Sequence, residues 1–357
     1  METADPTLPG RPGVVERTDP LVGRTLGEFT VRERIGEGGF GAVYRADQPR
    51  LAREAVIKTL HRHLSRSPDV VARFEREAKL ASRLEHPYAA HVYAYGAEPD
   101  GLLWIAMERV RGATVTEILE RTGTMPLDQL VGLFERICEV VHTAHEQGII
   151  HRDIKPSNVM VLARAGRLLP KLLDFGIAKA LGGTVGEPVP PRPHRAIDPL
   201  DATLADDTDP DPDPEHEHEL DPEHDPEHSS TRAGVVIGSP AYMAPELFDG
   251  AEHATPQADL YALGVFAYRT LTGRHPFEEQ TLAALEDAHR SHPVPPVGAG
   301  LPAALDAVLG RAMAKRAADR HATALELAAA LRRAAGMEEP DAKLPRLPVT
   351  LRDAVVA

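Results

Sequence analysis

Two short segments of the chain carry residue types that could do chemistry together. One reads HRDIKPSN at residues 151–158, and the other reads DFG at residues 174–176. Phosphoryl transfer from a nucleotide requires a carboxylate near the attacking hydroxyl, oxygen ligands for Mg²⁺, and cations that neutralise the moving phosphate. The two segments offer all three kinds of group, so they predict this reaction. The residues that would supply them are Asp153, Lys155, Asn158 and Asp174.

A glycine cluster in the segment IGEGGFGAVY, residues 35–44, adds a second signal. Its spacing alone also fits a plain hairpin turn, and a dinucleotide-binding fingerprint would need a helix directly after the glycines. The residues that follow read as a strand, so the turn is predicted to fold its backbone N–H groups over phosphates. Lys58 lies fifteen residues beyond Val43 in another strand, with Val56 on its side of the pleat, where the ammonium can reach those phosphates. The glycines are Gly36, Gly38 and Gly41.

The elements that must position these residues fall into two parts. Between Glu28 and Glu108, short β-like runs dominate, and one helical stretch at Pro68–Leu84 interrupts them. After Gly112 the pattern is mostly helical, with one apolar stripe that stops at Gly148. A small sheet-rich part followed by a larger helical part predicts an α+β protein of two lobes with a cleft between them, and clefts of this kind usually hold ligands.

Two later helix starts are marked by their own residues. Thr255 and Pro256 read as the N-cap and first turn of a helix that is apolar nearly all round up to Gly273, and is therefore predicted to be buried. Thr323 and Glu326 have the spacing of a capping box, which predicts the start of the last helix.

Together these residues resemble one family, the eukaryotic-like protein kinases, and Lys155 resembles the serine/threonine branch found in bacteria. The resemblance runs from about Glu28 to Gly336. It implies a bilobal protein-kinase fold of the α+β class, with a small, mainly antiparallel-sheet N-lobe and a larger helical C-lobe. It also implies ATP and Mg²⁺ as cofactors, and transfer of the γ-phosphoryl group of ATP to serine or threonine hydroxyls of protein substrates.

The resemblance gives each catalytic group a role. Asp153 would orient or deprotonate the substrate hydroxyl, and Lys58 and Lys155 would neutralise phosphate charge. Asn158 and Asp174 would hold Mg²⁺.

Further residues obtain roles from the same resemblance. Glu77 would be the helix partner of Lys58, although a surface salt bridge is an alternative for it. Asp259 would brace the catalytic loop, and Glu246 of the APE motif would pair with Arg320. Met107 would be the gatekeeper, and Glu108 to Val110 the hinge that binds adenine. The other predicted nucleotide-binding residues are Gly36, Gly38, Gly41, Val43, Val56 and Met160, with Glu117 at the ribose.

Val56 departs from the family pattern, which usually has alanine at this position over the adenine. Val56 would place two additional methyl groups over the base, opposite Met160. We expect a crowding cost of up to roughly 1 to 3 kcal/mol, and hence weaker nucleotide binding than alanine would allow.

Regulation is suggested by Arg152, which in the family pairs with a phosphorylated activation segment. Thr231 lies seven residues before Gly238 and is the predicted autophosphorylation site. Ser239 occupies the position of the substrate-docking loop, where it would act as a specificity element.

An acidic, proline-rich stretch interrupts the activation segment and is predicted to be disordered, because it cannot bury enough apolar surface to offset its ordering entropy. The simplest interpretation is a tolerated, solvated loop. Alternatives are an electrostatic bait for basic substrates or for the regulatory arginine, and weak metal capture by its histidines.

The predicted boundaries are a flexible tail at 1–27, the N-lobe at 28–111, the C-lobe at 112–336 with the insertion at 182–230, and a C-terminal tail at 337–357.

Charge and composition narrow the function classes. The 357 residues carry a formal net charge of -14, but thirteen acidic residues and no Lys or Arg lie between Asp201 and Ser230, so the remainder is nearly neutral. A near-neutral body gives no electrostatic case for nucleic acid or an anionic membrane as the main partner. No apolar run reaches the roughly 18 residues of a membrane span, and no signal peptide is recognisable, so a cytoplasmic location is expected. Cys138, the single cysteine, is predicted to be a buried thiol.

Lysine is scarce, so a lysine in a polar cluster marks a position of interest. Only seven of the forty basic residues are lysines: Lys58, Lys79, Lys155, Lys171, Lys179, Lys315 and Lys343.

Two other functions stay open. A nucleotide-binding pseudokinase scaffold is disfavoured by the intact catalytic and Mg²⁺-binding residues, although Val56 leaves it some room. A small-molecule phosphotransferase on the same fold is disfavoured by Lys155, Ser239 and the APE motif. Expected partners are protein substrates, and the resemblance is compatible with a homodimer or with a second copy as trans-autophosphorylation partner.

Overall fold

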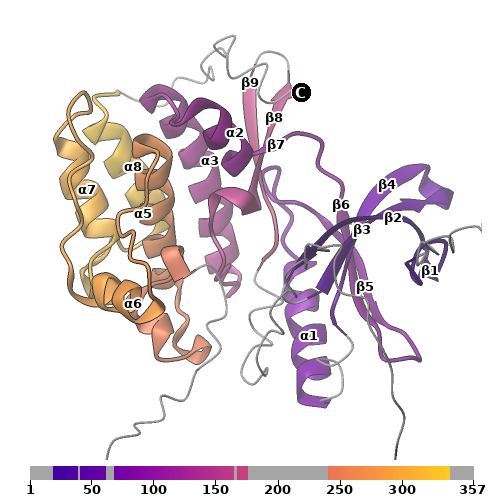
Figure 1. The fold of residues 1–357 in the computed structure, drawn as a ribbon. Coiled ribbons are helices and arrows are strands. Elements are labelled where there is room, and N and C mark those ends of the chain that lie inside the picture. Colours follow the sequence, from indigo (N-terminus) through magenta and orange to yellow (C-terminus); the bar gives the residue numbers. More distant parts are fainter. Residues whose placement is uncertain (1–18, 39–40, 62–67, 165–166, 176–239, 338–357) are drawn as a thin grey trace, which may run out of the picture. The chain divides into compact units, whose positions relative to one another are not determined.

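The structure is a computed structural model of the 357-residue chain. Thr231, Ser239 and the acidic insertion lie outside the residues that it describes. Figure 1 shows the described elements, which include a six-stranded sheet with helix α1 beside it, a three-stranded sheet, and a group of helices. The described residues are 19–38, 41–61, 68–164, 167–175 and 240–337.

The six-stranded sheet is antiparallel, in the order β1-β2-β3-β4-β6-β5. Side chains alternate between its two faces: on β4, Ala55 and Ile57 are buried, whereas Val56 and Lys58 on the other face are half-buried. Its strands are β1 (Thr25–Leu26), β2 (Phe29–Gly38), β3 (Gly41–Gln48), β4 (Arg53–Thr59), β5 (Val92–Ala97) and β6 (Leu103–Glu108).

Helix α1 (Pro68–Ala81) packs against β5. Val70, Phe74 and Ala78 recur every four residues and are buried on this face. The helix was expected to reach Leu84 and ends three residues earlier.

The predicted N-terminal tail is wrong for residues 19–27. Leu21 and Leu26 are buried with Phe29 in a cluster on the sheet, and β1 pairs with β2. Asp19 accepts hydrogen bonds from the backbone N–H of Leu21 and the hydroxyl of Tyr44. The buried leucines, the strand pairing and the Asp19 hydrogen bonds together hold this segment against the sheet.

The sole tryptophan, Trp104 on β6, packs on the face of this sheet that also buries Leu26 and Phe29. Its ring lies so close to Gly27 and Gly96 that a Cβ built on either glycine would come within 2.9 Å of it. Its indole N–H donates to Glu98 at 2.8 Å. Trp104 therefore serves as an intrinsic fluorescent reporter for the sheet.

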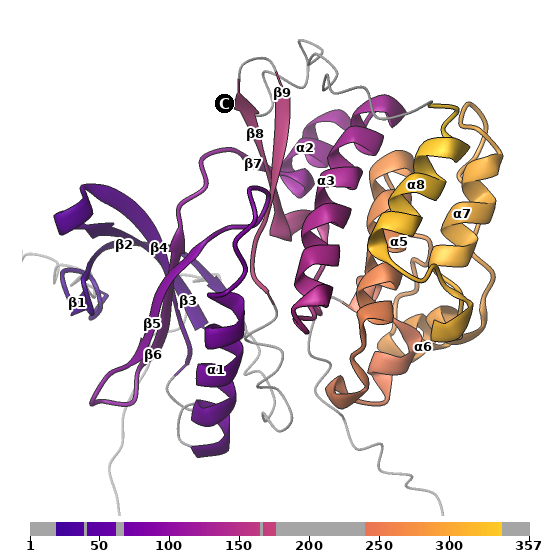
Figure 2. The ribbon, with the colours of Figure 1, turned by 180° about the vertical axis from the view of Figure 1, so that it is seen from behind.

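The remaining helices gather around α3 and α5, as Figure 2 shows from behind. α5 is buried nearly all round, as predicted, and ends where Gly273 adopts φ +74°. The described elements of this part are β7 (Ala113–Thr114), α2 (Val115–Thr122), α3 (Leu127–Glu146), β8 (Val159–Arg164), β9 (Arg167–Leu172), α5 (Pro256–Thr272), α6 (Leu282–Ser291), α7 (Ala304–Ala312) and α8 (Ala324–Ala334). Short 3₁₀ turns lie at Pro49–Leu51, Pro156–Asn158, Pro240–Tyr242, Pro245–Phe248, Ala251–His253 and Ala317–Asp319.

Two predicted helix starts differ in detail. Thr255 precedes α5, but its side chain makes no capping hydrogen bond. Thr323 does cap α8 by accepting from the N–H of Glu326, whereas the carboxylate of Glu326 accepts from Ala322 instead of closing the reciprocal bond. The spacing located both helix starts correctly but did not determine these bonds.

Cys138 is fully buried in α3, where burial raises the pKa of its thiol. None of the helices in the described part of the chain combines the length and apolar character needed to cross a membrane.

Candidate active site

The loop that carries the predicted catalytic residues, called the catalytic loop below, follows α3 and ends in a 3₁₀ turn at Pro156–Asn158. The side-chain amide of Asn158 donates to the carbonyl of Asp153 at 2.8 Å and to its carboxylate at 2.9 Å. The ammonium of Lys155 lies 3.0 Å from the same carboxylate oxygen. Two donors thus orient the Asp153 carboxylate, and the charged one, Lys155, makes the stronger contact.

Asp259, on the buried helix α5, braces this loop. Its carboxylate accepts hydrogen bonds from the backbone N–H groups of His151 and Arg152 and contacts the His145 ring, each at 2.8 Å. Burial by itself would raise the pKa of Asp259, but the His145 contact and the other donors outweigh it and hold that pKa below its ordinary value. The carboxylate therefore stays ionised and holds Arg152 in its left-handed conformation, φ +63°.

Lys58 and Asp174 form an ion pair, although 116 residues separate them in the sequence. The segment that carries Asp174 is tied to the catalytic loop, because Leu173 donates its N–H to the carbonyl of Asn158 at 2.8 Å. The carbonyl of Leu173 in turn contacts Nε2 of His151 at 2.8 Å. These bonds connect Lys58 of β4, Asp174 and the catalytic loop into one cluster.

The predicted pair between Lys58 and Glu77 is wrong for this structure. Glu77 on α1 contacts Arg76 at 3.2 Å and Arg152 of the catalytic loop at 3.9 Å. The Lys58 ammonium is neutralised by Asp174 instead, and Arg152 supplies the cation that faces Glu77.

The glycine segment spans two antiparallel strands, as predicted, since Gly36 pairs with Val43 and Gly38 with Gly41 across β2 and β3. Residues 39 and 40, which join the two strands, lie outside the described residues. A Cβ on Gly41 would lie 1.6 Å from the carbonyl oxygen of Thr59, so only glycine fits there. Val43 lies directly opposite Lys58 in the register of β3 and β4, which brings the glycine turn and the strand cation together.

The residues predicted to bind adenine lie on β4, at and beyond the end of β6, and on β8. Met107 is buried and lies opposite Val56 across β4 and β6. Val110 and, on β8, Met160 are half-buried. Val56 itself packs against the main hydrophobic core, which adds a packing role to the one that the sequence predicted for it.

Glu117 has a local role that the sequence reasoning missed. Thr114 and Glu117 form a complete capping box at the start of α2, in which one carboxylate oxygen of Glu117 accepts from both the N–H and the hydroxyl of Thr114. The T-x-x-E spacing was visible in the sequence. A ribose contact would have to use the other carboxylate oxygen.

Comparison with known proteins places this arrangement in a family. A model of the protein kinase domain matches residues 29–189 and 224–297. The chain belongs to this family. It is 36% identical over 315 residues to serine/threonine-protein kinase Pkn1 of Myxococcus xanthus, a match that covers 87% of this chain and 38% of Pkn1. It is 33% identical over 320 residues to PknB of Mycobacterium tuberculosis, covering 88% of this chain and 44% of PknB.

The same fold occurs in a solved kinase domain. The crystal structure of the Mycobacterium tuberculosis PknI kinase domain matches with a TM-score of 0.62 and 25% identity, over 88% of this chain and 99% of that domain. The predicted serine/threonine kinase resemblance and fold class are confirmed. The chain spans less than half the length of Pkn1 or PknB.

In this kinase domain Arg320 is buried and forms an ion pair with the half-buried Glu246. Two guanidinium nitrogens of Arg320 each donate to the Glu246 carboxylate at 2.7 Å, and the arginine side chain is fully buried. Arg320 also donates to the carbonyls of Ala314, Gln257 and Lys315, so all five of its N–H groups have acceptors. The pair joins the 3₁₀ turn at Pro245–Phe248 to the turn that precedes α8.

The donor set of the kinase site fits Mg²⁺. Asp174 offers a carboxylate, and Asn158, whose amide nitrogen is directed at Asp153, offers its amide oxygen. In the described part of the chain no group of three or more His, Cys, Asp or Glu could form a metal cage by itself. Mg²⁺ in phosphoryl-transfer sites commonly uses one or two protein oxygens, with phosphate and water completing the octahedron.

Sequence reasoning also missed a set of charges around the hinge, namely Glu54, Arg109, Arg111 and Lys171. The scarcity of lysine singled out Lys171 without indicating its partner. The other three carried no signal, because isolated charges in or beside strands are usually solvated.

Proposed function

We propose that this kinase domain transfers the γ-phosphoryl group of ATP to serine or threonine hydroxyls of protein substrates. The observation that supports it most is the single cluster formed by the Lys58–Asp174 pair and the Asp153–Asn158–Lys155 contacts. Phosphoryl transfer depends on such positioning and charge stabilisation more than on covalent chemistry. The chain's relatives Pkn1 and PknB are named serine/threonine-protein kinases.

In this proposal Asp153 orients the substrate hydroxyl and accepts its proton as the new O–P bond forms. The bond between the γ-phosphorus and its bridging oxygen breaks, and ADP leaves. Lys155 neutralises charge on the phosphoryl group in transit, and Lys58 does so on the phosphates of the nucleotide. Asn158 and Asp174 would hold Mg²⁺, which when bound offsets the charge that builds up on the phosphates.

The nucleotide would lie against the half-buried face of β3 and β4. The glycine turn would cover the phosphates, and the backbone of Glu108 to Val110 would bind adenine between Val56 and Met160. Glu117 would reach the ribose, and Met107 would limit the depth of the site.

Autophosphorylation at Thr231 is part of the proposal, with Arg152 as the receiver of the new phosphate. Mass spectrometry of the chain after incubation with Mg²⁺ and ATP is expected to find phosphate on Thr231. An unmodified Thr231 under conditions where substrates are phosphorylated would remove this part. Ser239 stays a predicted specificity element.

A transfer assay with γ-labelled ATP tests the main proposal. The full chain is incubated with Mg²⁺ and a generic basic protein, and the label is then identified on phosphoserine or phosphothreonine. Omission of Mg²⁺ and the Asp174→Asn variant serve as controls, and both are expected to abolish labelling. Nucleotide binding without labelling would favour the pseudokinase scaffold, and labelling of small molecules alone would favour the small-molecule phosphotransferase.

A further inference from the structure

From here on the hinge is extended by one residue, to Glu108–Arg111, and it is then charged at three of its four positions. All three side chains have partners on neighbouring strands. These strands are β4 on one side and β9 on the other, so the hinge is held from both.

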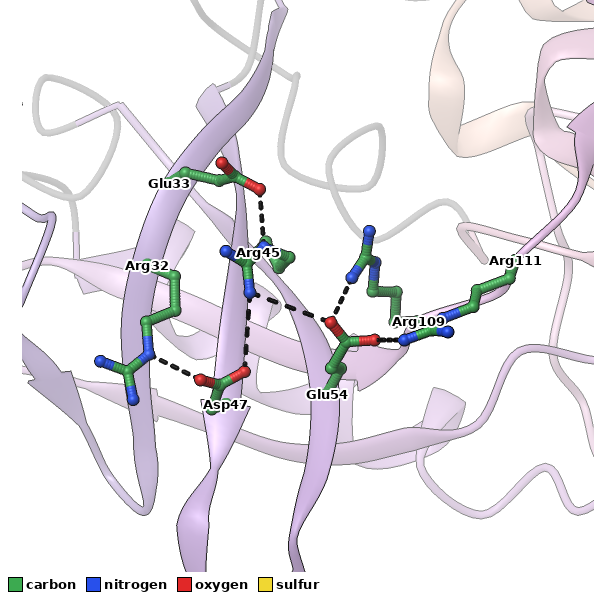
Figure 3. A network of polar contacts seen from close by, with 7 residues as sticks. All are labelled: Arg32, Glu33, Arg45, Asp47, Glu54, Arg109 and Arg111. Carbon is green, nitrogen blue, oxygen red and sulfur yellow. Dashed lines mark hydrogen bonds and ion pairs between the residues drawn. The ribbon is translucent and has the colours of Figure 1, made fainter. Parts of the chain in front are cut away.

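The first anchor is Glu54 on β4. Figure 3 shows its carboxylate between Arg45, Arg109 and Arg111. Arg109 and Arg111 both donate hydrogen bonds to Glu54, and Arg45 lies 3.9 Å away as a third cation. The hydrogen bond from Arg111, above all, lowers the pKa of Glu54, so the carboxylate stays charged near neutral pH.

Glu54 lies on the face of β4 that carries the proposed nucleotide contacts. Successive side chains of a strand alternate between faces, so Glu54, Val56 and Lys58 share one side of the sheet. Glu54 can therefore transmit a change at the hinge arginines to the two neighbours that would cover adenine and phosphate.

The second anchor is Lys171 on β9. Its ammonium donates to the carboxylate of Glu108 at 2.8 Å and to the carbonyl of Ala89 at 3.0 Å. Next to it, Leu172 forms two backbone hydrogen bonds, with Tyr88 at 2.7 Å and with Ala90 at 2.9 Å. Lys171 thus joins the start of the hinge to the strand that leads to Asp174.

We propose that Glu54 and Lys171 are positioning residues, which hold the hinge at the separation from β4 and β9 that adenine binding requires. This proposal rests on the proposed kinase function. It adds that ATP affinity is set in part by side chains that do not touch the nucleotide.

If these ion pairs served only to stabilise the fold, their loss would lower the thermal midpoint and leave nucleotide affinity unchanged. Arg111 is 76% exposed, and ion pairs with such exposure contribute little to folding stability. Two arginines drawn to one carboxylate mainly restrict where the hinge backbone can lie. Their loss should therefore alter nucleotide affinity more than the thermal midpoint.

The test compares four variants of the full chain with wild type: Glu54→Gln, Lys171→Met, Lys171→Arg, and Arg32→Gln as matched control. Arg32 belongs to the network in Figure 3, where it pairs with Asp47 at 2.6 Å, but it does not contact the hinge. Each variant is measured for the dissociation constant of a non-hydrolysable Mg²⁺–ATP analogue, for KM and kcat, and for the thermal midpoint.

We expect Glu54→Gln to weaken analogue binding and raise KM by about threefold, and Lys171→Met by about tenfold, because its contacts are less exposed. The kcat should stay within about twofold, as expected when binding and not transition-state stabilisation is removed. Lys171→Arg should retain most of the wild-type affinity, and Arg32→Gln should match wild type.

Unchanged affinity in Glu54→Gln and Lys171→Met would overturn the inference, as would a fall in kcat at constant affinity. If wild type transfers phosphate and these variants match it, only the inference fails. If wild type binds no nucleotide, the inference fails together with the proposed function.

Discussion

The catalytic loop and the hinge are both held by carboxylates, but in opposite surroundings. Asp259 is fully buried and accepts from backbone N–H groups of the loop. Glu54 is partly exposed and binds long arginine side chains. A buried acceptor with backbone donors permits a single arrangement, whereas exposed side-chain pairs can shift and are screened by salt. The loop is therefore expected to be rigid, and the hinge adjustable.

The largest effect should come from removing the buried brace. Asp259→Ala leaves two backbone N–H groups and the His145 ring without their acceptor, so the free energy of unfolding should fall by about 3 to 5 kcal/mol. Phosphoryl transfer should be lost with it. Urea denaturation, followed by Trp104 fluorescence and by circular dichroism, measures the change.

Asp249→Ala is the control for this variant, because Asp249 pairs with Arg290 on the surface and is 59% exposed. It should change the urea midpoint far less than Asp259→Ala does. Equal urea midpoints for the two variants would show that Asp259 contributes no more to folding stability than a surface aspartate.

Lowering the pH should reduce folding stability through a buried histidine, while the exposed ion pairs of Glu54 persist. His289 is fully buried against Tyr261, and burial, aided by Lys315 and His275, lowers its pKa to about 3. The unfolded chain takes up this proton below about pH 6.5 and the folded chain does not, so stability is full above that pH and is lost on acidification, by about 2 kcal/mol at pH 5.

Thermal midpoints of wild type and His289→Gln between pH 7.5 and 5 check this. The variant should be less stable at pH 7.5 but should lose less on acidification. A wild-type curve and a variant curve of the same slope would contradict the assignment. The pKa of Glu54 is lowered, so the hinge pairs should persist over this whole range.

An intermediate effect is expected at Val56, which lies on β4 between Glu54 and Lys58. Val56→Ala should increase ATP affinity by about threefold, within the crowding cost expected for two additional methyl groups. Calorimetric titration with Mg²⁺–ATP measures it. Equal affinity in the variant and in wild type would remove the crowding argument.

The smallest effect should be that of salt. Raising NaCl from about 0.05 to 0.5 M shortens the screening length to a few ångströms, so the KM for ATP should rise more in wild type, by about twofold, than in Glu54→Gln. The kcat should change less, because the Asp259 brace is buried. If KM rises with salt equally in Glu54→Gln and in wild type, the salt effect comes from charges other than the Glu54 pairs.

The sequence predicted what depends on residue type at short range. The residues of HRDIKPSN form local contacts, such as Asn158 to Asp153, and their spacing alone brings them together. Strand alternation likewise placed Val56 beside Lys58 on one face. These features could be found without knowing how distant elements approach one another.

The rest depended on contacts between distant elements. Whether Glu77 meets Lys58 or Arg152 is decided by where α1 lies relative to the catalytic loop, which no local pattern records. The anchor formed by Lys171 and Glu108 likewise depends on how β9 approaches the hinge. The burial of Leu21 and Leu26 was missed because two apolar residues among prolines form no periodic pattern.

The central claim is that Asp153 orients and deprotonates the substrate hydroxyl, and that other residues bind the nucleotide. The most direct measurement is the rate of labelling from γ-labelled ATP by wild type and Asp153→Asn, alongside the affinity of each for Mg²⁺–ATP. The account predicts that the variant loses about 10² to 10⁴ in rate, while its affinity stays within about twofold. Equal rates, or a loss of rate fully explained by lost affinity, would contradict it.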